Sequence, residues 1–167
     1  MPLSDALLPE FDHETGVTRR LLERLPDDKF EWTPHPKSMP LGRLAAHVAE
    51  VLTWLPETVH KNEINWDTTA PSQPKNFPTR ADVLKYFDES RDAARSALAG
   101  VSDAELMQPW SFKKDGQVVF SQPKVGVIRS MVLNHMIHHR AQLGVYLRMQ
   151  NVPLPAMYGP SADEGGF

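Results

Sequence analysis

Four long segments of the sequence repeat apolar residues at steps of three and four, and this periodicity limits the possible folds more than any other feature. The segments cover roughly Ser4 to Leu25, Leu41 to His60, Arg80 to Ala99 and Lys124 to Gln150. A helix with one apolar side has to bury that side against a neighbour. The sequence therefore predicts an all-α fold, a four-helix bundle, with residues 1–167 as a single domain.

The inward sides of these segments predict the core. Their stripes comprise Phe11, Leu22 and Leu25; Leu44, Val48, Val51, Leu52 and Leu55; Val83, Leu84, Phe87, Ala94 and Leu98; and Ile128, Met131, Val132, Leu143, Tyr146 and Leu147. Thr15 and Thr18 interrupt the first stripe, where they either line a pocket or serve helix–helix packing. Gly16 indicates a close approach to a neighbour, because glycine inside a helix costs about 1 kcal/mol relative to alanine.

Cap residues mark the expected ends of the helices. Thr79 is a good N-cap for the third helix, and Gly100 follows its last turn as a stop. Ser38 and Pro40 lie where the N-cap and the first turn of the second helix are expected.

The connecting segments have their own patterns. Asp115-Gly116, between the apolar residues of Trp110 to Phe120, predicts a small β-hairpin before the last helix. The link from Asn62 to Pro78 is rich in proline, and its 17 residues predict an ordered loop that crosses the end of the bundle. The tail that begins at Asn151 is rich in proline and glycine and is expected to be irregular.

Composition and charge exclude several classes of function. The formal net charge is −3 and no basic stripe is visible, which argues against nucleic acid as a partner. No apolar run approaches the roughly 20 residues that span a bilayer, and the N-terminus does not resemble a signal peptide, so a cytoplasmic location is expected. Cysteine is absent, which excludes disulfides, thiolate metal ligands and a cysteine nucleophile.

The stretch NHMIHHRAQL, residues 134–143, places three of the seven histidines in one helix. At about 100° per residue, His139 lies about 40° from His135 and His138 about 60° to the other side. Apolar residues share this face, so it is expected to turn toward the bundle interior. Buried imidazoles need partners, and one metal ion can satisfy several of them. The spacing alone does not decide between His138 and His139.

A third ligand would have to come from another helix. His47 is the best candidate, because Leu44, Val48 and Val51 flank it on its own apolar stripe. The remaining histidines lie away from the apolar stripes: His13, His35 and His60. A single histidine on an apolar face is more often a hydrogen-bonded core residue than a ligand, so the residues by themselves leave both readings open.

Other polar residues near these histidines have two readings each. Glu50 either reaches the site, as a base or to orient a ligand, or lies on a solvated helix face. Gln142 either bonds a ligand or substrate or packs in the core. Trp54 either walls a pocket or belongs to the plain core. Arg140 is expected to point away from the histidines, toward the surface or a dimer contact, and Tyr158 to pack over the bundle.

Three stretches, SMPLGRLAAHVAEVLTW, NHMIHHRAQLGVYLR and VPLPAMYGPSADE, resemble the DinB/YfiT-like superfamily of bacterial four-helix proteins. The resemblance implies an up-down-down-up bundle and, as for many members, a homodimer. It also implies a metal-binding histidine triad with one residue on the second helix and an HxxxH pair on the last. That triad falls on His47, His135 and His139, and leaves His138 outside the ligand set.

Three neutral imidazoles with open positions suit a divalent Zn, Ni, Fe, Mn or Co ion. Some members of the family transfer low-molecular-weight thiols such as bacillithiol or mycothiol, or use them in isomerisation. The sequence is therefore expected to encode a metal-dependent enzyme for a small molecule, of the thiol transferase or hydrolase type. The alternative is a non-enzymatic helical dimer with a structural metal or none. An open coordination position favours the enzyme, and a fourth protein ligand favours the structural role.

Overall fold

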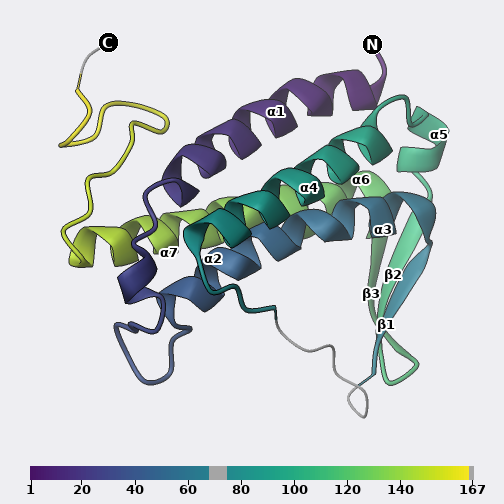
Figure 1. The fold of residues 1–167 in the computed structure, drawn as a ribbon. Coiled ribbons are helices and arrows are strands. Elements are labelled where there is room, and N and C mark those ends of the chain that lie inside the picture. Colours follow the sequence, from purple (N-terminus) through teal and green to yellow (C-terminus); the bar gives the residue numbers. More distant parts are fainter. Residues whose placement is uncertain (68–74, 166–167) are drawn as a thin grey trace.

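Helices dominate the structure, a computed structural model that describes residues 1–67 and 75–165 (Figure 1). The α-helices are α1 (Leu3–Leu22), α2 (Leu41–Glu50), α3 (Trp54–His60), α4 (Arg80–Leu98), α5 (Asp103–Leu106), α6 (Lys124–Val127) and α7 (His135–Met149). The strands are β1 (Glu63–Trp66), β2 (Pro109–Lys114) and β3 (Gln117–Pro123). No α-helix in the described ranges is long and apolar enough to cross a membrane.

Two of the four bundle rods are composite. A 3-10 turn, Val51–Thr53, joins α2 to α3, so the predicted second helix is two α-helical pieces. A π-helical segment, Ile128–Asn134, joins α6 to α7 in the predicted fourth helix. The other two rods, α1 and α4, are single helices whose bounds lie within three residues of the predicted ones.

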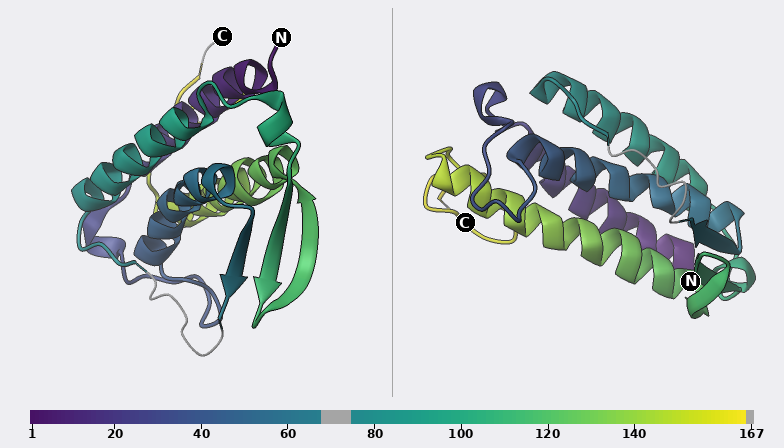
Figure 2. Two further views of the ribbon diagram at one scale, coloured as in Figure 1. Left: turned by 90° about the vertical axis from the view of Figure 1, so that its right-hand side faces the viewer. Right: turned by 90° about the horizontal axis from the view of Figure 1, so that it is seen from below.

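The rods run up, down, down and up, as the resemblance implies. In Figure 1 the α2–α3 rod and α4 run in the same direction, while α1 and α7 run in the opposite one. Helix α1 packs against α4 and α7, and α2 packs against the same two helices. Both further views show the four rods gathered around one core (Figure 2).

The predicted stripes fill that core. Phe11, Leu44, Phe87 and Leu143, one from each rod, are all buried. Of the residues predicted for the core, three are half-buried at its edge: Leu84, Met131 and Tyr146. Neither threonine is needed as a pocket lining, because the hydroxyls of Thr15 and Thr18 donate to carbonyls of their own helix.

The cap predictions had mixed outcomes. The Thr79 hydroxyl accepts from the Asp82 amide at the start of α4, and Gly100 after its end has a φ of +76°. Ser38 is not the cap of α2, because that helix starts directly after Pro40 without a side-chain cap. The expectation for Gly16 is also wrong, since a Cβ there would meet nothing within 4 Å.

The predicted hairpin is confirmed as β2 and β3, with Asp115 and Gly116 at φ values of +48° and +79° in its turn. The sheet has a third strand, which the sequence did not predict. Strand β1 pairs in parallel with β2, Glu63 opposite Ser111, so part of the proline-rich link is extended rather than loop. The alternation of polar and apolar residues in β1 covers only four positions, which is too short to predict a strand. Pro71 and Pro74 of the link lie outside the described residues.

Arg140 points away from the histidines as predicted, but the prediction that it lies at the surface is wrong. This side chain is buried rather than exposed, and it forms an ion pair of 2.8 Å with Glu14 of α1. It also donates to the hydroxyl of Thr18 and to that of Tyr158, which reaches back from the irregular tail. The Tyr158 hydroxyl in turn donates to Glu14 at 2.7 Å. We call Arg140, Glu14, Thr18 and Tyr158 the arginine network, and it fastens the tail to the bundle.

Candidate metal centre

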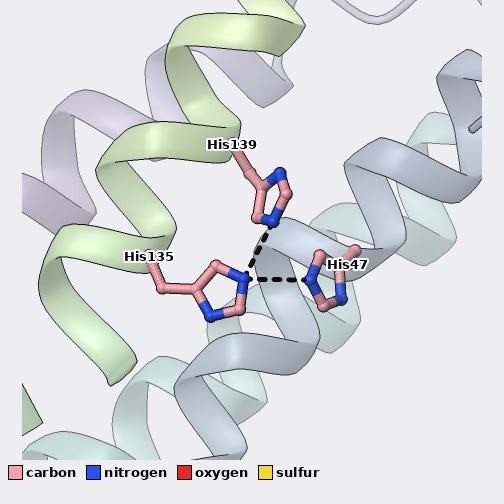
Figure 3. A group of neighbouring side chains, drawn as sticks. All are labelled: His47, His135 and His139. Atoms are coloured by element: carbon pink, nitrogen blue, oxygen red, sulfur yellow. Dashed lines mark hydrogen bonds between the residues drawn. The ribbon is translucent and has the colours of Figure 1, made fainter. Parts of the chain in front are cut away.

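Two packed helices bring three histidines together. His47 comes from α2, and His135 and His139 come from successive turns of α7, which lies against α2 (Figure 3). The Nε2 atom of His135 lies 3.4 Å from that of His47 and 2.8 Å from that of His139. We call these three residues the histidine cluster. All three are half-buried, with 14% of the His47 side chain exposed.

The outward nitrogens of the three rings each have a hydrogen-bond acceptor. His47 Nδ1 lies 3.3 Å from a Glu50 carboxylate oxygen, and His139 Nδ1 lies 2.7 Å from Gln142 Oε1. His135 hydrogen bonds to the backbone of Met131, one turn earlier in the same rod. An acceptor needs the ring proton on its own side, so these contacts place the three protons at the outer nitrogens. The three Nε2 lone pairs are then left facing one another.

The local electrostatics favour the neutral form of His135 and His139. Burial, followed by the neighbouring His139 and His47, lowers the pKa of His135 to about 4. Burial also lowers the pKa of His139, against the opposing effect of its hydrogen bond to Gln142. A metal ion binds neutral imidazole, so this environment holds His135 and His139 in the required form at neutral pH.

Glu50 is itself fixed by its neighbours. Its carboxylate accepts from the backbone amide of Lys75 at 2.9 Å and pairs with Arg43 at 2.8 Å. Burial alone would raise the pKa of this carboxyl, but the hydrogen bonds from His47, Lys75 and Arg43 lower it to about 2. Glu50 is therefore ionised near neutral pH and orients His47, which agrees with the first of the readings from the sequence.

The donor set fits a divalent ion. The three ring nitrogens lie within 4.8 Å of one another, and in the described ranges they form the one such group of histidine, cysteine or acidic side chains. His138 is exposed, and its ring lies 4.9 Å from that of His139, between centroids, in a T-shaped arrangement. The other histidines are exposed elsewhere: His13, His35 and His60.

Trp54 closes one side of the cluster. Its ring lies 6.1 Å from that of His47 and 5.2 Å from that of His135, measured between centroids. It therefore walls the site, which was one of its two sequence readings.

Two features of the site had no sequence signal. The π-helical segment directly before His135 has no characteristic residue, although such segments are frequent at functional sites. Arg43 lies one turn before His47, and only the fold shows that it reaches Glu50.

Comparisons with known proteins agree with this picture. The sequence model of the DinB superfamily matches residues 10–143. The uncharacterized protein YrdA of Bacillus subtilis strain 168 is 24% identical over 164 residues, which cover 96% of this chain and 90% of that protein.

Two solved structures share the fold. A DinB-like protein from Bacillus cereus ATCC 10987 superposes with a TM-score of 0.69 and 20% identity, covering 92% of this chain and 97% of its own. The DinB-like protein YjoA from Bacillus subtilis superposes with a TM-score of 0.68 and 18% identity, covering 90% and 96%. At these identities the likeness concerns the fold.

Proposed function

The chain belongs to the DinB superfamily, and from this premise we propose that it is a metal-dependent enzyme for a small molecule, of the thiol transferase or hydrolase type. We propose His47, His135 and His139 as the ligands of one divalent Zn, Ni, Fe, Mn or Co ion.

One observation carries this proposal: three Nε2 atoms converge while each outward nitrogen has its own acceptor. With the protons on the outer side, three lone pairs face each other in a half-buried site. Unpartnered buried lone pairs are unfavourable, and a cation between them removes the conflict. Three protein ligands also leave a coordination position for water or substrate, as in catalytic sites.

The chain's own residues then have distinct roles. Glu50 and Gln142 hold the rings of His47 and His139 in orientation and keep their protons at Nδ1. Trp54 excludes water from one side of the cluster. When bound, a divalent ion would lower the pKa of a coordinated water or thiol and so generate the nucleophile. Because the chain has no cysteine, a thiol would have to be a cosubstrate.

Metal analysis of protein purified without a histidine tag tests the ligand set. We expect about one divalent ion per wild-type chain and a near-complete loss in His47→Ala, His135→Ala and His139→Ala. His138→Ala is the matched control, because this exposed histidine sits on the same helix and should keep the ion. Equal metal content in the wild type and His47→Ala would contradict the proposal.

The open position is tested with cobalt-loaded protein and a small thiol such as N-acetylcysteine. A thiol that coordinates the ion should produce a thiolate-to-cobalt charge-transfer band, and His139→Ala should abolish it. Absence of the band in metal-loaded wild type would remove the thiol from the proposal and leave a hydrolase. A fourth protein ligand in a metal-bound structure would instead make the ion structural.

We further propose that the protein acts as a homodimer. Helix α7 supports this, because Val145 and Met149 are apolar and more than half exposed on its outer side. Sedimentation equilibrium should give twice the chain mass of 18.8 kDa. A monomeric mass at micromolar concentration would contradict it.

A further inference from the structure

An apolar cavity of about 250 Å³ lies between the sheet and the bundle, because residues of α3, α6 and the π-helical segment line it together with residues of β1 and β2. Aromatic rings make up much of its wall, and three of the four tryptophans contribute: Trp54, Trp66 and Trp110. Phe112 of β2 lies on the same wall. An engineered cavity of about 150 Å³ is large enough to bind benzene, so this one has room for a two-ring aromatic molecule.

The cavity adjoins the histidine cluster. Trp54 lines the cavity and also lies 5.2 Å from the His135 ring, between centroids. Met131 lines it too, and its backbone bonds the same histidine. A molecule in the cavity would therefore lie directly behind the side chains that wall the proposed metal site.

The polar groups of the wall select among ligands. Glu57 is the acidic lining residue, and no basic residue lines the cavity among the described residues. Lys61 pairs with Glu57 from its exposed side. The Thr58 hydroxyl donates its hydrogen bond to the backbone carbonyl of Trp54. Such a wall disfavours an anionic ligand, because a negative charge would be buried against apolar side chains with no cation of the wall to pair with it.

The indole of Trp110 adds a second observation. Trp110 is 5% exposed, and its Nε1 is buried without a hydrogen-bond partner in the part of the chain that is described. Buried tryptophan N–H groups normally have a partner, and the π face of an aromatic ligand can accept from such a group.

We propose that this cavity binds the aromatic part of the substrate, a neutral or cationic two-ring molecule of about the size of an indole. The inference rests on the proposed function, since it assigns the cavity to the substrate of the same site. It identifies a substrate class that the histidine cluster alone does not indicate.

Titration of the metal-free, nitrogen-15-labelled protein tests the proposal, with tryptamine, 3-methylindole and indole-3-acetate as probes. The indole N–H signals of Trp54, Trp66 and Trp110 should shift saturably with the first two probes. Trp32 is the internal control, because it packs on Tyr146 and does not line the cavity. Indole-3-acetate should bind at least about tenfold more weakly than tryptamine.

Two variants locate the binding. Trp66→Ser should weaken 3-methylindole binding about tenfold. Its control is Val118→Thr, an equally exposed apolar position on β3 that does not line the cavity. Unchanged tryptophan signals, equal affinity for the acidic and basic probes, or equal effects of the two variants would each overturn the proposal.

Its failure can be told apart from failure of the metal centre. Probe binding by His47→Ala should match that of the wild type, because His47 does not line the cavity. Metal binding without probe binding would overturn the cavity proposal alone. Probe binding by a chain that takes up no metal would overturn the proposed function, and the cavity would then be a binding site without the adjacent ion.

Discussion

Helix α7 carries two polar groups of residues on opposite sides, and adjacent positions, His139 and Arg140, belong to different groups. The arginine network is closed: the guanidinium of Arg140 meets the carboxylate of Glu14, and the hydroxyls of Thr18 and Tyr158 join them. The histidine cluster is open, because three like nitrogens converge and no oppositely charged side chain of the described residues lies between them.

This difference separates structure from function in one helix. A buried polar group whose bonds are all made inside the protein stabilises or specifies the fold and has nothing left to bind a ligand with. A group of lone pairs directed at one point is unfavourable unless a cation lies at that point. The two sides of α7 should therefore respond oppositely to substitution.

The largest effect is expected from opening the closed network. Arg140→Met leaves the Glu14 carboxylate buried and uncompensated, which should lower the free energy of unfolding by about 3–5 kcal/mol. Chemical denaturation of the metal-free protein measures it. Metal affinity at the histidine cluster should stay the same.

Two further variants check the reason for that loss. The double variant Arg140→Met, Glu14→Gln should recover part of the stability, because it removes the unpaired charge. Arg129→Met is the matched control, since Arg129 pairs with Glu10 at the surface and should cost at most about 1 kcal/mol. Equal losses in Arg140→Met and Arg129→Met would show that Arg140 and Glu14 do not form a buried ion pair as described.

The open cluster should respond to pH. The pKa of His135 is about 4 in the folded protein against 6.5 for the free side chain, so between these values the unfolded chain binds more protons. Stability of the metal-free protein should therefore fall as pH decreases from 6.5 to 4. After allowance for partial exposure, the loss from His135 amounts to about 2 kcal/mol.

Denaturation curves at several pH values measure the slope of the free energy of unfolding against pH. His135→Asn should flatten it, whereas Gly16→Ala, which changes no titratable group, should shift the curves without changing their slope in this window. A slope in His135→Asn equal to that of the wild type would mean that His135 is not held neutral by the fold.

Replacing a residue that orients a ligand should weaken metal binding less than replacing the ligand itself. Glu50→Gln keeps an oxygen near His47 but removes the charge, and should weaken metal binding about 10–100-fold. Competition with a chelator of known affinity measures it. Glu89→Gln, an exposed glutamate on α4, is the control and should have no effect.

The sequence predicted the parts of the molecule that depend on periodicity. Stripes at helical spacing gave the rods and core, and the inward position of His47 and the HxxxH pair indicated the three histidines. Asp115-Gly116 gave the hairpin, because a tight turn demands such residues.

What the sequence did not predict depends on distant partners. Arg140 looked like a surface residue because its partner Glu14 lies 126 positions away on α1. Strand β1 is extended because β2 pairs with it, and its own four residues are all exposed. Glu50 reaches His47 instead of water because Arg43 and Lys75 hold it. Such contacts follow from the fold and leave no local pattern.

The smallest predicted effect separates helix stability from the site. Gly16 lies on α1, which contributes Glu14 and Thr18 to the arginine network and no residue to the histidine cluster. A Cβ at Gly16 would meet nothing within 4 Å, so Gly16→Ala should raise the free energy of unfolding by about 0.5–1 kcal/mol and leave metal affinity unchanged.

Gly42→Ala is the matched comparison on α2, the helix of His47. Its Cβ would lie 2.7 Å from the Phe30 ring, so α2 or Phe30 has to move and the protein should lose stability. Because His47 lies on the same helix, metal affinity should weaken as well. If instead Gly16→Ala changes metal affinity as much as Gly42→Ala does, the two sides of α7 are coupled, and the division between a closed structural network and an open site does not hold.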